Sequence, residues 1–171
     1  MDYTLANLTE FTGAKRRTVQ VWAEGGVIQA EASTSRAGTG VHRRFSRDEA
    51  IIACLVHAFA RRLQSPIGVL LRISALVRES LGGKKFRTMI EKAISGEAEV
   101  FVVLIGSGAP KFVIKFGDGS VDDVLTMGAY DAQAGGAELA KLIGQRVIDS
   151  LDGYGSFVGI VKANEYLSRL K

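Results

Sequence analysis

Basic side chains that could bind a polyanion are concentrated in one stretch near the start of the sequence. Between residues 13 and 47 there are only two acidic residues, both glutamates. The basic residues in this stretch are Lys15, Arg16, Arg17, Arg36, Arg43, Arg44 and Arg47. From residue 96 onward acidic residues prevail instead, among them Asp118, Asp122, Asp123, Asp131, Asp149 and Asp152. The net charge of +4, from 22 basic and 18 acidic residues, hides this separation. It predicts a polyanion-binding module joined to a part that does not touch the polyanion.

Cysteine and histidine chemistry finds little support in the sequence. Cys54 is the only cysteine, so a disulfide framework and a cysteine metal cluster are both excluded. It lies in an apolar helical run, where we expect a small buried side chain rather than a redox sensor. His42 and His57 both lie in the N-terminal half, so a histidine-based catalytic triad in the C-terminal half is excluded. We expect His57 to be structural.

Two further motifs have simpler explanations than a ligand site. The carboxylates of Asp118, Asp122 and Asp123 could bind a divalent cation, but no further ligand follows at suitable spacing, so we expect a solvated turn. Gly106 and Gly108 follow a strand, as in a nucleotide-binding loop. Pro110 and another strand come next, however, and no helix N-terminus is available to hold a phosphate. We therefore expect no enzyme activity, metal or cofactor.

The elements that position the basic residues follow from apolar spacing and from helix-capping residues. We expect helices over residues 4–12 and 15–22, separated by Gly13, with Trp22 in the core. An exposed loop over residues 33–40 and a strand over residues 41–45 should follow. Ser46 then caps a helix that extends to about residue 63.

The rest of the chain predicts a helical connector and a small α+β region. Ser65 as N-cap and Pro66 as first helical residue begin a helix that ends at Leu81, and another covers residues 84–95. Strands are expected over 100–105 and 111–116 as a hairpin, over 121–127 and over 157–161. A helix over 138–151 and a short one capped by Asn164 complete the set. The fold class is α+β, divided into residues 1–64, 65–95 and 96–171.

An ordered set of short motifs covers about residues 3–60, the first third of the sequence. These are Tyr3-Thr4-Leu5, Thr12-Gly13 with Thr18-Val19 and Trp22, Gly25-Gly26-Val27-Ile28, and Arg43-Arg44-Phe45-Ser46. In this order they resemble the DNA-binding domain of the MerR family of winged helix-turn-helix proteins. The resemblance implies a winged helix-turn-helix whose second helix enters the major groove of double-stranded DNA.

The resemblance also implies which residues contact DNA. On the second helix, or just before it, these are Lys15, Arg16, Arg17, Thr18 and Gln20. Arginine can pair with guanine and glutamine with adenine. Arg43 on the wing strand would contact the backbone, with Arg44 and His42 beside it, and Arg36 on the loop would probe phosphate or the minor groove. The sequence departs from the family at Gln20, where an arginine is usual, and at Lys15, near which a serine is usual.

The resemblance favours a sequence-specific transcription regulator that acts as a homodimer or higher homo-oligomer, because a two-fold pair of domains recognises a palindrome. The helix ending at Leu81 could form the dimer contact, or the C-terminal sheet could assemble subunits or bind a protein partner. The alternatives are an architectural or recombination-directionality factor of a mobile element and, less favoured, an enzyme acting on nucleic acid. With no signal peptide and no long apolar run, we expect a cytoplasmic protein that does not bind membranes.

Overall fold

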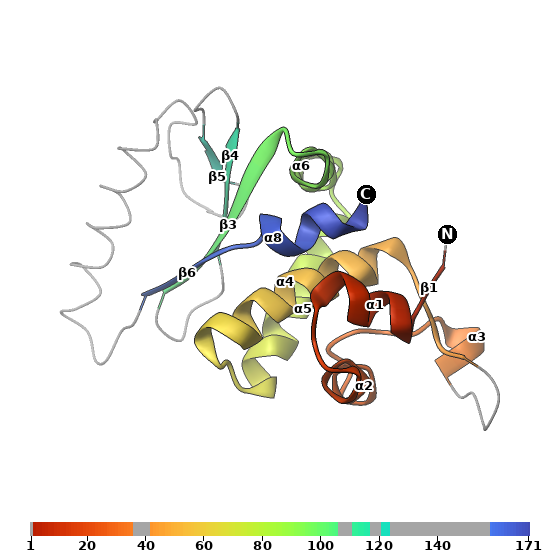
Figure 1. Cartoon of the computed structure of the whole chain (residues 1–171). Helices are drawn as coiled ribbons and strands as arrows, with labels where there is room; N and C mark the ends of the chain where they lie inside the picture. The colour runs from red at the N-terminus through yellow and green to blue at the C-terminus, as the bar shows by residue number, and fades with distance from the viewer. Residues whose placement is uncertain (1, 36–41, 106–110, 117–120, 124–157) are drawn as a thin grey trace. The chain divides into compact units, whose positions relative to one another are not determined.

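The structure is a computed structural model that describes residues 2–35, 42–105, 111–116, 121–123 and 158–171. Its described part is mostly helical and contains two antiparallel sheets, which confirms the α+β class (Figure 1). By their internal contacts the residues form two compact units, Met1–Arg87 with Glu165–Lys171, and Thr88–Asn164. The division into residues 1–64, 65–95 and 96–171 stays a prediction.

The first two helices begin and end as their local sequence predicts. Helix α1 (Leu5–Thr12) starts at Thr4, whose hydroxyl accepts a hydrogen bond from the Asn7 amide at 3.3 Å, and the Asn7 side chain bonds back to the Thr4 amide. It ends at Gly13, which has a left-handed backbone with φ of +70°. Helix α2 (Arg16–Glu24) follows, and α1 packs against both α2 and α4 (Figure 1).

The strand expected over residues 41–45 is shorter than predicted. Strand β2 (Arg44–Phe45) pairs antiparallel with β1 (Tyr3–Thr4) at the start of the chain, so that Tyr3 lies opposite Phe45. The region expected to be a loop begins with a short helix, α3 (Ala32–Ser35). Residues 36–41, which include Arg36, lie outside the described residues.

Helix α4 (Arg47–Leu63) is the centre of the N-terminal unit. Ser46 caps it by accepting a hydrogen bond from the Glu49 amide at 3.3 Å, as expected. Every residue from 49 to 59 is buried. A helix that is covered on all sides is typical of the core, and it explains why Cys54 is buried here.

Helices α5 (Ile67–Leu81) and α6 (Lys84–Ser95) form the predicted helical region. The predicted start of α5 is wrong by one residue, because Pro66 is the N-cap and has an extended backbone with ψ of 157°. Ser65 therefore does not cap the helix. Helix α4 ends at Leu63, and its C-cap residue Gln64 has a left-handed backbone (φ 47°) that turns the chain before Pro66.

The second unit contains an antiparallel sheet with the strand order β5-β4-β3-β6. The expected hairpin is formed by β3 (Ala98–Ile105) and β4 (Lys111–Phe116), in which Val100 lies opposite Ile114. Strand β5 (Val121–Asp123) pairs with β4, and β6 (Val158–Lys162) pairs with β3. The helix expected over residues 138–151 and the end of the strand expected over 121–127 lie outside the described residues.

The last residues of the chain return to the N-terminal unit. Helix α8 (Asn164–Leu167) and the 3-10 helix η1 (Ser168–Leu170) follow β6, and η1 contacts α1. Tyr166, Leu167 and Leu170 are buried, so the C-terminus contributes core to the unit formed by the first 87 residues. Asn164 was expected to cap this helix, but its side chain instead bonds to the Val100 amide and the Ala98 carbonyl, both at 2.7 Å.

Within the described ranges, no helix combines the length and the apolar character needed to cross a membrane.

Candidate nucleic-acid interface

The start of α2 presents three basic side chains to solvent. Lys15, Arg16 and Arg17 are exposed, because Val19 and Trp22 turn the opposite side of the helix into the core, where they are 0% and 3% exposed. The prediction that Trp22 belongs to the core is therefore confirmed.

No side chain caps this end of α2. Lys15 is the N-cap residue, and its backbone carbonyl accepts a hydrogen bond from the Thr18 backbone amide at 2.8 Å. The side chains of Lys15 and Arg16 form neither a hydrogen bond nor an ion pair with any described residue. The first amide groups of a helix carry partial positive charge, so free cations beside them create a local site for an anion.

Two of the expected DNA contacts engage another residue of the same helix. The side-chain amide of Gln20 donates a hydrogen bond to one oxygen of the Glu24 carboxylate at 2.9 Å, and the Arg17 guanidinium lies 3.9 Å from the other oxygen of Glu24. Thr18 and Gln20 are half-buried. A role for Gln20 in reading a base would therefore require its side chain to leave Glu24, a partner one turn away on the same helix that was not predicted from the sequence.

The described part of the expected wing lies around β2. His42 and Arg44 are exposed and Arg43 is half-buried. The Arg44 backbone is tied to the preceding segment, since its amide donates to the Thr34 hydroxyl at 3.0 Å and its carbonyl accepts from the Glu31 amide at 2.8 Å. These two bonds close the base of the loop, while Arg36 lies outside the described residues.

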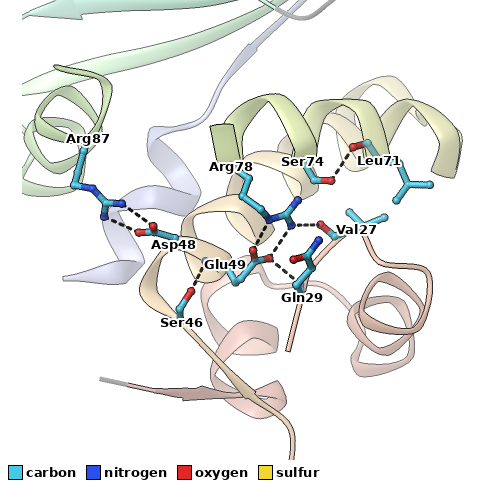
Figure 2. Close-up of polar contacts among 9 residues, drawn as sticks. All are labelled: Val27, Gln29, Ser46, Asp48, Glu49, Leu71, Ser74, Arg78 and Arg87. Carbon is cyan, nitrogen blue, oxygen red and sulfur yellow. Dashed lines mark hydrogen bonds and ion pairs between the residues drawn. The ribbon is translucent and has the colours of Figure 1, made fainter. Parts of the chain in front are cut away.

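A partly buried ion pair joins α4 and α5 and was not predicted from the sequence. The Glu49 carboxylate accepts two hydrogen bonds from the Arg78 guanidinium, at 2.7 and 3.0 Å, and one from the backbone amide of Gln29 at 2.8 Å (Figure 2). The guanidinium also donates to the Val27 carbonyl at 3.2 Å. The acids after Ser46 are a sequence signal for a helix start, but nothing local indicates that one of them meets α5.

A second ion pair begins in the same turn of α4. Arg87 donates to both oxygens of Asp48 at 2.7 Å (Figure 2). Its guanidinium also donates to the Leu81 carbonyl at 2.8 Å. This pair is more exposed, with side chains 44% and 34% accessible against 28% and 9% for Arg78 and Glu49. Neighbouring acids on α4 therefore hold two different arginines in two different environments.

Buried reactive groups lie further along α4. Cys54 is fully buried, which confirms that it is a packed side chain. Burial raises the pKa of its thiol to about 12, which keeps it protonated. His57 is buried against the rings of Tyr166 and Trp22, at centroid distances of 5.0 and 5.9 Å. Desolvation, and then the charges of Arg61 and Arg169, lower the pKa of His57, while Glu165 opposes this effect.

In the described part of the chain, no three His, Cys, Asp or Glu side chains are close enough together to hold a metal ion. Asp118 lies outside that part, so the expected solvated turn around Asp118, Asp122 and Asp123 stays a prediction.

Comparison with known proteins adds no family to this geometry. No protein-family model matches the chain, and no curated protein matches it either.

Proposed function

We propose that the N-terminal unit is a MerR-like winged helix-turn-helix that binds double-stranded DNA, with α2 in the major groove and the segment around residues 33–45 on the backbone. One observation carries this proposal: the exposed cations at the uncapped start of α2. Cations at a helix N-terminus oppose the helix dipole, so Lys15 and Arg16, whose side chains have no partner among the described residues, do not serve the stability of α2. A bound phosphate would offset this repulsion.

The arrangement of the unit is consistent with this role. Val19 and Trp22 anchor α2 while its basic side stays in solvent, which is what a recognition helix requires. The exposed side chains of His42 and Arg44 follow a loop whose base is closed by backbone bonds. The acidic C-terminal part of the chain would assemble subunits or bind a protein partner rather than DNA.

The biological role we propose is sequence-specific transcription regulation by a dimer. Two copies related by a two-fold axis would read a palindrome, with half-sites about one helical turn apart. Helix α5 offers apolar surface for such a contact, since Ile67 and Leu71 lie one turn apart on it and are 45% and 38% exposed.

A charge-matched pair of variants tests the assignment of α2. Arg16→Ala and Arg72→Ala each remove one exposed cation from a helix and change the net charge equally. We expect Arg16→Ala to weaken duplex binding about tenfold and to reduce the slope of log affinity against log salt by about one. Arg72→Ala should leave both quantities near the wild-type values, because Arg72 belongs neither to α2 nor to the segment around residues 33–45 and is not one of the two apolar residues proposed for the dimer contact.

Titrations of labelled duplex by fluorescence anisotropy at several salt concentrations provide the measurement. Equal weakening by both variants would mean that binding follows net charge, and the assignment of α2 would be wrong. Genome-wide binding sites separate the two biological roles, because palindromes at promoters support a regulator and clustered sites at an attachment locus support a recombination factor. The stoichiometry on a palindromic duplex reports whether two chains bind together.

A further inference from the structure

The segment that follows α2 is attached to the end of that helix by its backbone. The amides of Val27 and Ile28 both donate to the Trp22 carbonyl, at 2.9 and 3.3 Å. The side chains of all three residues are buried. Any displacement of this segment would therefore be transmitted to the last turn of α2.

The same segment is held from its other side by the Glu49–Arg78 pair. The Val27 carbonyl accepts from Arg78, and the Gln29 amide donates to Glu49 (Figure 2). A carbonyl and an amide two residues apart are thus bound by one guanidinium and one carboxylate that also bind each other. Arginine suits this position because its planar fork can serve a carboxylate and a carbonyl together.

The chain enters the wing directly after this segment. Glu31, two residues beyond Gln29, makes the backbone bond to Arg44 that closes the base of the loop. The Glu49–Arg78 pair therefore lies at the junction between α2 and the loop that leads to β2, and it joins that junction to α4 and α5.

We propose that Arg78 and Glu49 are positioning residues that set the placement of α2 relative to the wing, so that Arg78, on α5, controls DNA specificity without touching DNA. This inference rests on the proposed function. Base readout depends on geometry, because paired hydrogen bonds to a base edge are lost when the reading helix shifts. Binding to phosphates along the duplex tolerates such shifts, because it depends mainly on charge.

The Asp48–Arg87 pair supplies a matched control. It begins in the same turn of α4 and also consists of two hydrogen bonds, made by Nη1 and Nη2 of Arg87 where Arg78 uses Nε and Nη2. Its guanidinium reaches the Leu81 carbonyl instead of the Val27 carbonyl. Arg78→Lys and Arg87→Lys both preserve net charge. A lysine ammonium lacks the fork that binds a carboxylate and a carbonyl simultaneously, so each variant weakens the contacts of the arginine that it replaces.

The experiment uses two duplexes of equal length, one selected from a random pool by the wild-type chain and one unrelated. We expect Arg78→Lys to lower the ratio of the two affinities about tenfold, as for the loss of one base contact, with little change in binding to the unrelated duplex. Arg87→Lys should keep the ratio within about twofold of the wild-type value. Circular dichroism and urea denaturation would first identify conditions in which all three proteins are fully folded.

The outcomes separate this inference from the function on which it rests. If the wild-type chain binds no duplex, the proposed function is wrong. If it binds and Arg78→Lys retains the wild-type ratio, or Arg87→Lys lowers it equally, the positioning role is wrong. Amide hydrogen exchange of the wild-type chain adds a test that needs no variant, because the Gln29 amide should be protected like that of Val27; rapid exchange at Gln29 would overturn the proposal.

Discussion

The N-terminal turn of α4 and its middle both bury polar side chains, but only the buried side chain in the N-terminal turn has hydrogen-bond partners among the described residues. The Glu49 carboxylate accepts hydrogen bonds from the Arg78 guanidinium and from the Gln29 backbone amide, so its charge is paired and its orientation is fixed. About two turns later, the His57 ring is buried with neither nitrogen bonded to a described residue, and the Tyr166 hydroxyl beside it is in the same condition.

The difference follows from the cost of burying each group. An unpaired buried carboxylate is costly, so Glu49 requires a partner and its geometry is restricted. A neutral imidazole or phenol without a partner costs about 1–3 kcal/mol, which aromatic packing can offset. One end of α4 therefore supplies directional contacts that position other segments, while the middle supplies mainly packing.

The largest effect is expected when Glu49 is removed. Glu49→Ala leaves the Arg78 guanidinium and the Gln29 amide without their partner, and should lower the free energy of unfolding by on the order of 3 kcal/mol. Asp48→Ala should cost about 1 kcal/mol or less, because that pair is more exposed. Urea denaturation measures both, and equal losses would contradict the distinction between the two pairs.

A pH-dependent effect is expected at His57. Because the pKa of His57 in the folded chain is lowered, the unfolded chain takes up a proton first as the pH falls below its ordinary value of 6.5. The stability contributed by the neutral ring is complete above that pH and is lost as the pH falls toward the folded pKa, by at most about 1.4 kcal/mol per pH unit.

His57→Leu provides the reference for this effect. The loss of stability between about pH 7.5 and pH 5.5 should be smaller in the variant than in the wild type, since a histidine changes charge in this range. Arg61, Arg169 and Glu165 are retained in both proteins, so their contribution to the comparison is the same. An identical pH dependence in the two proteins would show that His57 does not titrate as described.

The smallest effect is expected from the Tyr166 hydroxyl. Tyr166→Phe removes a buried polar atom that has no partner among the described residues, while the ring that packs on His57 is kept. We expect the free energy of unfolding to rise by about 1 kcal/mol or less. A clear loss of stability in thermal or urea denaturation would mean that the hydroxyl is bonded in solution.

Several elements of the fold could be predicted because their signals lie within a few residues. Thr4 and Ser46 cap their helices through residues three positions later, and Gly13 ends α1 through its own backbone freedom. The three-residue spacing of Val19 and Trp22 was enough to identify the inner side of α2. The same spacing exposes Lys15, Arg16 and Arg17, whose proposed contacts with DNA stay a prediction.

Only the tertiary structure decided which distant residues meet. Glu49 and Arg78 are 29 positions apart, and either could have been a solvated charge on a helix surface. The return of Tyr166 to the ring of His57 likewise has no local signal. Capping and helix periodicity are properties of the local chain, whereas an ion pair forms only after packing has brought two helices together and removed water from between them.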